Sequence, residues 1–255
     1  MSELNTIFQF YLYYLEKAYL DYWLVVIGAG VFLLYFIFRL RTKRFYFIRH
    51  GQTILNKEHI KQNNKGGLTE AGKEQAERIG EYLKQYNIQK MYVSPYERTT
   101  ETAEIINKSL NTSVRYSPLL VERRNPSEIV GKSYYDLEVK KIIDLIDLSY
   151  HADDMRYSDE ENFNDLKKRA RKCLDFLGSS FSWRIVVVTH GVFLKMLLSY
   201  ILNGKDLHNS AYVRLSFFNP ADNGGVTVCE YTPWKKWITA GRGWKILNYN
   251  ENLTK

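Results

Sequence analysis

The chain has 255 residues, and 45% of them are hydrophobic, which excludes a disordered or low-complexity protein. Its formal net charge is +8. Residues 1–38 hold three acids and one lysine, so residues 39–255 carry +10. A basic domain suits nucleic acid, an anionic membrane surface or phosphorylated compounds, and because no nucleic-acid-binding motif is present we expect no nucleic-acid partner. Cys173 and Cys229 lack the spacing of a zinc site, which favours two reduced thiols.

An uncharged run near the N-terminus extends from Tyr22 to Phe38 and would span about 25 Å as a helix, close to the thickness of a bilayer core. A basic cluster follows at once: Arg39, Arg41, Lys43 and Arg44. The acidic start argues against a cleaved signal peptide, and the lack of a polar face argues against a core helix. The positive-inside rule then places the N-terminus outside and the rest of the chain in the cytoplasm. We therefore predict an N-terminal extension (1–21), a single-pass transmembrane helix in the lipid bilayer (22–38), a basic juxtamembrane linker that contacts anionic headgroups (39–44) and one folded domain (45–255).

Strand and helix patterns alternate from residue 45 onward. Apolar runs predict strands at residues 45–48, 91–93, 114–116, 185–188, 211–218 and 226–231. Helices are predicted after the N-cap Thr69, after Pro95, and over residues 134–148, 161–177 and 191–202. The acidic residues 149–161 are typical of an exposed loop. This alternation predicts an α/β fold, a three-layer α/β/α sandwich with a mostly parallel central sheet, preceded by the transmembrane helix.

Two histidines, His50 and His190, lie at the ends of predicted strands, and each is followed by glycine. Because the carboxyl ends of parallel strands share one sheet edge, we expect both rings at that edge. An imidazole nitrogen can attack a phosphoryl group when the other ring nitrogen donates to a fixed acceptor. Arginine forks pair well with phosphate oxygens, and Arg49 and Arg98 are expected at the same edge. The sequence therefore predicts a phosphate pocket with an imidazole nucleophile.

A leaving alkoxide needs a proton, so a carboxylic acid is expected near this pocket. Glu122, in the loop after the third predicted strand, is the preferred candidate, and Glu128 is a rival. Arg123 and Arg124 either form a solvated pair or reach a distal anion of the substrate, and both interpretations stay open at this point.

These motifs, in this order, resemble the histidine phosphatase superfamily and its clade of cofactor-dependent phosphoglycerate mutases. The matching segments are Arg49-His50-Gly51-Gln52-Thr53, residues 67–72, 94–103 and 120–123, and Thr189-His190-Gly191, within about residues 44–205. The resemblance implies that His50 is phosphorylated, that Glu122 donates the proton, and that the phosphate is bound by Arg49, Asn56, Arg98 and His190. It implies a metal-independent phosphoric monoester hydrolase that needs no cofactor and takes a phosphorylated small molecule or phosphoprotein as substrate.

The chain departs from the family pattern after Glu122, where it reads Arg123-Arg124-Asn125-Pro126-Ser127-Glu128. Glu161 is retained without its usual neighbours, and the long insertion of the mutases is not evident, which favours hydrolysis. Two other hypotheses stay open: a non-catalytic scaffold that binds a phosphorylated ligand at the membrane, and a phosphoglycerate mutase-type phosphotransferase. The substrate also stays open between small metabolites, a lipid-linked phosphate and a phosphoprotein.

Overall fold

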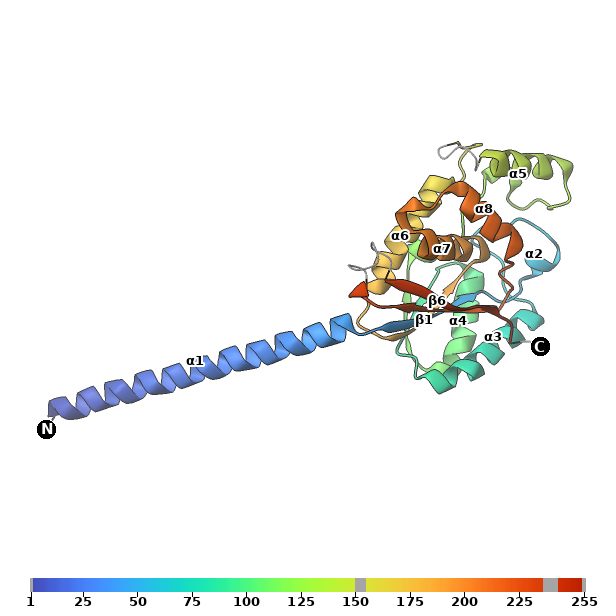
Figure 1. Ribbon diagram of the computed structural model, residues 1–255. Coiled ribbons are helices and arrows are strands. Elements are labelled where there is room, and N and C mark those ends of the chain that lie inside the picture. Colours follow the sequence, from blue (N-terminus) through green and yellow to red (C-terminus); the bar gives the residue numbers. More distant parts are fainter. Residues whose placement is uncertain (1, 150–154, 236–242, 254–255) are drawn as a thin grey trace. The chain divides into compact units, whose positions relative to one another are not determined.

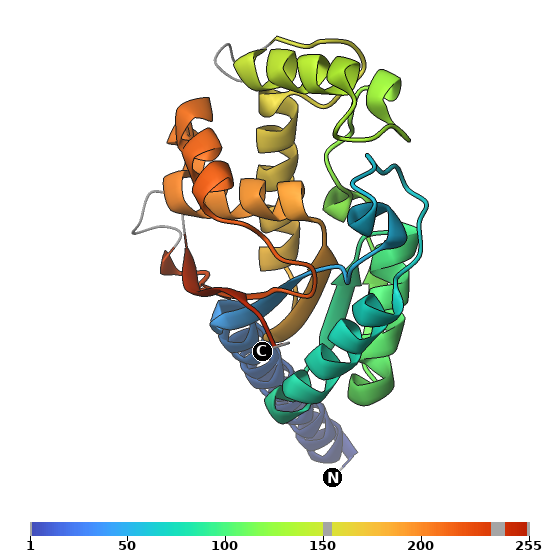
Figure 2. The same cartoon turned by 90° about the vertical axis from the view of Figure 1, so that its right-hand side faces the viewer.

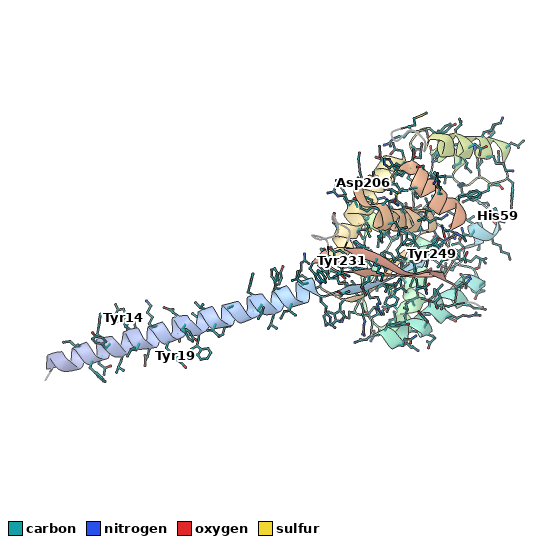
Figure 3. The ribbon with its side chains drawn as sticks, viewed as in Figure 1. Tyr14, Tyr19, His59, Asp206, Tyr231 and Tyr249 are labelled. Carbon is teal, nitrogen blue, oxygen red and sulfur yellow. The ribbon has the colours of Figure 1, made fainter. Side chains whose placement is uncertain are left out.

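The computed structural model describes residues 2–149, 155–235 and 243–253, which form two compact units, Met1–Arg41 and Thr42–Lys255. The first unit is one continuous helix, α1 (Ser2–Leu40) (Figure 1). Within the described residues it contains the one segment, Ile7–Ile37, that is long and apolar enough to cross a bilayer, and none of that segment is buried. Figure 3 shows its side chains, Tyr14 and Tyr19 among them, standing off the helix along its length. The helix passes through residue 21 without a break, so the division between residues 1–21 and 22–38 stays a prediction.

One mixed sheet forms the centre of the second unit, and among the described residues it has six strands in the order β3-β2-β4-β1-β5-β6. The strands are β1 (Lys43–Arg49), β2 (Lys90–Val93), β3 (Ser113–Tyr116), β4 (Arg184–Thr189), β5 (Val226–Tyr231) and β6 (Trp244–Glu251). β3, β2, β4 and β1 pair in parallel, β5 is antiparallel to β1, and β6 is antiparallel to β5. All strands but β5 therefore run in one direction, and the predicted mostly parallel sheet is confirmed.

Helices cover both faces of this sheet because successive strand residues point to opposite sides. Phe45 and Phe47 belong to a core cluster with α6 (Phe163–Gly178) and α7 (Gly191–Asn203). Tyr46 and Ile48 belong to the opposite cluster with α3 (Glu70–Leu83) and α4 (Glu97–Leu110) (Figure 2). Each fully buried large apolar side chain contributes about 1.5–3 kcal/mol, so both helical layers are held firmly against the sheet. The three-layer α/β/α arrangement is confirmed.

Two helices begin close to the sequence signals that predict them, and the helices predicted from residues 134 and 161 begin at Leu137 and Phe163. Thr69 caps α3 by accepting a hydrogen bond from the Gly72 N–H, and Pro95 lies two residues before α4. The remaining helices are α2 (Ile54–Lys57), α5 (Leu137–Ser149) and α8 (Asn209–Phe218). Of the predicted acidic loop, residues 150–154 lie outside the described residues, and Glu160 in the part that is described is buried.

The predicted strand at residues 211–218 is wrong, because these residues form α8. Their tyrosine, valine and phenylalanines have high strand propensity, but Tyr212 is buried in the core cluster of α7, and this packing overrides the local preference. β6 is not predicted from the sequence, because its lysine and two asparagines make the alternation of apolar and polar residues hard to recognise. Among the described residues β6 pairs only with β5, and a strand with one neighbour needs a less apolar pattern.

β1 begins at Lys43, two residues earlier than the apolar run indicates. The Lys43 side chain is 1% exposed, and its Nζ donates a hydrogen bond to the Gly178 carbonyl. The neighbouring Arg44 lies 3.8 Å from Glu230 on β5. The structure thus corrects the expectation that Lys43 contacts lipid headgroups. The linker between α1 and β1 is also shorter than predicted and consists of Arg41 and Thr42.

Candidate active site

The two histidines lie side by side at the carboxyl edge of the sheet. His50 directly follows β1 and His190 directly follows β4, and the register of these neighbouring strands pairs Arg49 with Thr189. Their ring centroids are 5.3 Å apart, and the residues are 3% and 0% exposed. Two histidines that are 140 positions apart in the sequence therefore share one buried site.

Hydrogen bonding fixes the tautomer of His50. Its Nδ1 lies 2.8 Å from the Gly51 carbonyl oxygen, which can only accept, so Nδ1 carries the proton. Its Nε2 accepts a hydrogen bond from Arg98 Nε at 3.1 Å. Burial, together with the charges of Arg98 and Arg49, holds the pKa of His50 well below its usual value of 6.5. The ring is therefore neutral at neutral pH, and the Nε2 lone pair is free of a proton.

His190 is held in the same protonation state. Its Nε2 is 2.8 Å from the Ser94 hydroxyl, and its ring lies 5.2 Å from the Tyr96 ring, centroid to centroid. Burial and the nearby Arg98 keep the pKa of His190 well below 6.5. Its Nδ1 is buried and has no hydrogen-bond partner in the described part of the chain. Since buried polar atoms are normally paired, this nitrogen is suited to an oxyanion bound between the two rings.

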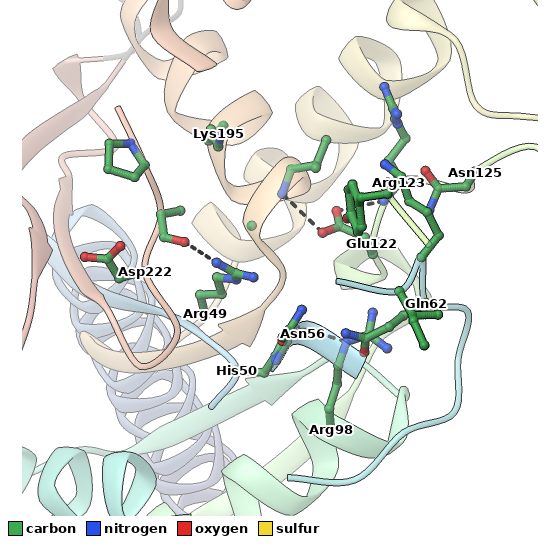
Figure 4. Close-up of a pocket in the computed structure, with 17 residues that line it drawn as sticks. Arg49, His50, Asn56, Gln62, Arg98, Glu122, Arg123, Asn125, Lys195 and Asp222 are labelled. Atoms are coloured by element: carbon green, nitrogen blue, oxygen red, sulfur yellow. Dashed lines mark hydrogen bonds between the residues drawn. The ribbon is translucent and has the colours of Figure 1, made fainter. Parts of the chain in front are cut away.

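Arg49 and Arg98 bring two guanidinium groups to the pocket beside His50 (Figure 4). Arg98 is 2% exposed, and its Nη1 donates to the Asn63 carbonyl at 2.7 Å. Arg49 Nη1 donates to the Ala221 carbonyl, while its buried Nε has no partner among the described residues. Burial lowers the pKa of both arginines, yet a guanidinium stays charged in proteins. Two buried cations, with one Arg49 donor that has no partner among the described residues, are suited to bind an anion.

Two motif glycines allow the backbone around His50 to close. A Cβ on Gly51 would lie 2.4 Å from the Gly72 carbonyl oxygen, and a Cβ on Gly72 would lie 2.2 Å from the Gln52 carbonyl oxygen. Such backbone contacts leave no room for a side chain. Gly51 N–H also donates to the Thr102 hydroxyl at 3.1 Å, which ties the loop to α4. These contacts give a physical reason for the glycines after His50 and at the start of α3.

Glu122 reaches the pocket from the loop after β3. Its carboxylate accepts hydrogen bonds from the N–H groups of Val192 at 3.1 Å and Phe193 at 2.9 Å, at the start of α7, and from Arg123 N–H at 2.8 Å. These three backbone hydrogen bonds fix the position of the Glu122 carboxyl group at the start of α7. Glu122 therefore sits at the helix that His190 begins, on the pocket wall.

An ion pair that the sequence analysis did not predict braces the Glu122 segment. Arg169 binds Glu161 through two parallel hydrogen bonds of 2.7 and 2.6 Å, and both side chains are about 15% exposed. Its Nη1 also donates to the carbonyls of Leu119 and Val121. Glu161, noted in the sequence as a retained residue, thus acts on the backbone next to Glu122.

The structure separates the candidates that the sequence left open. Glu128 does not line the pocket, and its carboxylate accepts a hydrogen bond from the Ser158 hydroxyl at 2.9 Å. Arg123 lines the pocket, whereas Arg124 does not and donates to the Asp159 carbonyl at 2.6 Å. Asn56 lines the pocket as well.

Asn223 closes the site from a distant part of the chain. Its Nδ2 donates to the carbonyls of His50 and Gly51, at 3.0 and 3.2 Å, and to Asn56 Oδ1 at 3.2 Å. Asn223 lies in the Asn223-Gly224-Gly225 segment that directly precedes β5. No sequence motif marks this role, because it depends on the antiparallel return of β5 beside β1.

The resulting cavity has a volume of about 340 Å³. Besides the residues above, its wall includes two lysines and a tyrosine that the sequence analysis did not select: Lys61, Lys195 and Tyr134. Burial and Arg49 lower the pKa of Lys195, whose Nζ donates to the Ser216 carbonyl at 2.9 Å. The lining combines five basic side chains with two carboxylates, Glu122 and Asp222, so the cavity suits an anion larger than phosphate alone. In the described part of the chain, no cluster of three or more His, Cys, Asp or Glu is placed to hold a metal ion.

Known proteins share both the sequence pattern and the fold. The chain is 30% identical over 159 residues to the probable phosphoglycerate mutase GpmB of Erwinia tasmaniensis, covering 62% of this chain and 74% of that protein. It is 28% identical over 208 residues to the uncharacterized phosphatase PhoE of Bacillus subtilis, covering 80% and 93%. The solved structure of a mycobacterial glucosyl-3-phosphoglycerate phosphatase matches with a TM-score of 0.66 at 19% identity, covering 82% of this chain and 99% of that one. Finally, the profile of the histidine phosphatase superfamily (branch 1) matches residues 45–241, and the chain belongs to this family.

Proposed function

We propose that this protein is a metal-independent phosphomonoesterase that works through a phosphohistidine at His50. The observation that carries this proposal is the neutral His50 ring, with its proton held on Nδ1 by the Gly51 carbonyl and its Nε2 beside Arg98. Nothing further has to ionise before Nε2 attacks phosphorus. Two arginines beside the nucleophile supply the positive charge that a transferring phosphoryl group needs.

The reaction proceeds in two balanced steps. In the first, His50 Nε2 forms a bond to phosphorus, the bond from phosphorus to the ester oxygen breaks, and Glu122 in its protonated form gives the leaving oxygen a proton. In the second, water attacks phosphorus, Glu122 takes a proton from that water, and the phosphorus–nitrogen bond breaks. His50 then regains its lone pair, and inorganic phosphate leaves.

Each remaining site residue has a binding role in this scheme. Arg49, Arg98 and Asn56 hold the equatorial phosphoryl oxygens, and His190 donates to one of them. For His190 to donate through Nδ1, its Nε2 must accept a hydrogen bond from the Ser94 hydroxyl, which lies 2.8 Å away. This assignment agrees with the unpartnered Nδ1 and with the neutral ring.

We favour hydrolysis over mutase chemistry because the segment after Glu122 departs from the family pattern and the mutase insertion is not evident. A mutase remains the second candidate, favoured by a relative named as a phosphoglycerate mutase and by the additional basic residues of the cavity. Lys61, Arg123 and Lys195 suit a phosphomonoester that carries a second anionic group.

The anchoring of the protein is part of the same proposal. The apolar segment Ile7–Ile37, followed by Arg39 and Arg41, supports a single-pass protein whose N-terminus lies outside and whose catalytic domain lies on the cytoplasmic side. A phosphorylated small molecule or phosphoprotein would then be processed next to the membrane.

The test is hydrolysis of an aryl phosphate by the full-length chain in detergent, with a chelator present throughout. We expect His50→Ala to remove turnover, while His208→Ala, an exposed histidine outside the pocket, leaves turnover unchanged. Activity that survives His50→Ala, or that the chelator removes, contradicts the proposal. Phosphoglycerate supplied as substrate separates the two candidates, because a hydrolase releases inorganic phosphate and a mutase moves the phosphoryl group.

A further inference from the structure

A second surface of the catalytic domain is built like a site for an anionic partner, and it lies at the opposite end of the strands from His50. The amino ends of β1 and β4 meet there, and the antiparallel β5 ends there because Tyr231 pairs with Lys43. This end contains none of the residues that line the catalytic cavity.

A row of charged residues crosses four neighbouring strands at this end. The register aligns Arg184 of β4 with Arg44 of β1, Arg44 with Glu230 of β5, and Glu230 with Lys245 of β6. Residues in register on neighbouring strands point to the same face, so three cations share one carboxylate. Arg44 and Arg184 are both exposed. Arg44 lies 3.8 Å from Glu230, and Arg184 Nη1 donates to the Tyr86 carbonyl at 3.2 Å, so one carboxylate faces three cations and the row keeps a net positive charge.

Two exposed aromatic side chains lie a few residues along the chain from the ends of β4 and β5 at this edge. Phe181, three residues before Arg184, is 58% exposed, and Trp234, three residues after the end of β5, is 44% exposed. The Lys235 ammonium lies 5.6 Å from the centre of the Trp234 ring. Exposed aromatic rings beside basic side chains are typical of surfaces that enter the headgroup region of a bilayer. We name Arg44, Phe181, Arg184, Trp234 and Lys245 the amino-end surface.

The connection to α1 indicates which anion is available to it. α1 ends at Leu40 and β1 begins at Lys43, so the two intervening residues bridge at most about 10 Å. If α1 spans a bilayer, the start of β1 is confined to the headgroup layer by chain length alone. The cytoplasmic leaflet is anionic and attracts basic residues held close to it.

We propose that the amino-end surface docks on the anionic bilayer that α1 spans, an inference that rests on the proposed anchoring. Arg44 and Arg184 contact lipid headgroups, and Phe181 and Trp234 insert among them. β1 has seven residues and rises about 23 Å, so docking turns the His50 end of the sheet away from the lipid. The docked enzyme therefore takes a water-soluble phosphomonoester or a phosphoprotein segment, and not the headgroup of a neighbouring lipid.

Spin labels test this orientation on the full-length chain in phosphatidylcholine vesicles with and without phosphatidylserine. Cys173 and Cys229 are buried, so a label attaches to Phe181→Cys or to the control Tyr116→Cys. Tyr116 is 49% exposed and ends β3 at the His50 edge. We expect the label at 181 to leave water, becoming accessible to oxygen and not to a soluble nickel chelate, in vesicles with phosphatidylserine. The label at 116 should stay in water in both vesicle types.

A second measurement compares docking before and after the charges of Arg44 and Arg184 are removed. Each basic side chain near an anionic surface contributes a factor of about five, so Arg44→Gln with Arg184→Gln should lower the ratio of docked to undocked protein about 25-fold. If alkaline carbonate removes the chain from the vesicles, α1 does not anchor it, and the proposed anchoring and the proposed docking both fail. A chain that resists carbonate but keeps the label at 181 in water refutes the docking surface alone. If the label at 181 is shielded from the nickel chelate equally in detergent, the shielding comes from a protein contact, and this result also refutes the docking surface.

Discussion

The ion pair between Arg169 and Glu161 makes a quantitative prediction about the wall of the active site. Arg169 donates two hydrogen bonds to the Glu161 carboxylate and three more to the backbone carbonyls of Leu119, Val121 and Glu122. Its guanidinium carbon lies 3.9 Å from the centre of the Phe193 ring. Arg169→Met removes all five bonds and leaves the Glu161 carboxylate without its ionic partner in a site only 15% exposed. Breaking a buried pair in this way costs about 3–5 kcal/mol, and residual solvent access favours the lower value.

The assay is urea denaturation of the full-length chain in detergent, followed by near-ultraviolet circular dichroism. We expect Arg169→Met to lower the free energy of unfolding by about 3 kcal/mol. The matched control is Arg171→Met on the same helix, where the arginine lies 4.0 Å from Asp175 and is 70% exposed. An exposed pair contributes between 0 and about 1 kcal/mol, so the control should change stability little.

Activity provides the second readout. Because Arg169 holds the carbonyls on either side of Leu120, its loss should move Glu122 and lower kcat by more than the unfolded fraction explains. A loss of stability below about 1 kcal/mol for Arg169→Met would refute the reasoning, since it would make this pair equivalent to a surface pair.

Three further predictions concern the loop and rings of the site. The pKa values of His50 and His190 lie below their unfolded value of about 6.5, so the unfolded chain binds protons first as pH falls. In urea titrations, the contribution of these two histidines to the free energy of unfolding should be fully present above about pH 6.5. Below that pH, the free energy of unfolding should fall by up to about 2.7 kcal/mol per pH unit, and by half that slope in His50→Gln. Asn223→Ala removes hydrogen bonds to the His50 loop and should lower kcat/KM about tenfold in steady-state assays, while stability falls by about 1–2 kcal/mol. Gly51→Ala drives a Cβ into the Gly72 carbonyl, so thermal unfolding should show a loss of at least about 1–3 kcal/mol, and wild-type stability would contradict the packing.

Local sequence signals predicted the parts of the fold that local physics controls. The run Ile185–Val188 is apolar throughout because both faces of β4 are buried, and such a strand is visible without its neighbours. Thr69 is visible as a helix cap because its role depends on residues three positions away. α8 and β6 were missed or misassigned because packing against α7 and pairing with β5 determine them.

The same distinction between local sequence signals and tertiary packing applies to the residues of the site. His50 and His190 were selected because each follows an apolar strand within a motif, and the structure brings them together. Asn223 and Lys195 had no such signal, since each approaches the pocket through the tertiary fold. The sequence preferred Glu122 and kept Glu128 as a rival, and the structure places Glu122 on the pocket wall and Glu128 outside the pocket lining.

The central claim, nucleophilic attack by His50 Nε2, is tested most directly by trapping the intermediate. The full-length chain is mixed with a radiolabelled phosphodonor in chelator, quenched in alkali and mapped by peptide. We predict a label that is stable in alkali and labile in acid, located on His50, and lost in His50→Ala but retained in His208→Ala. Turnover without any label on His50, or a label on another residue that keeps pace with turnover, would contradict this account.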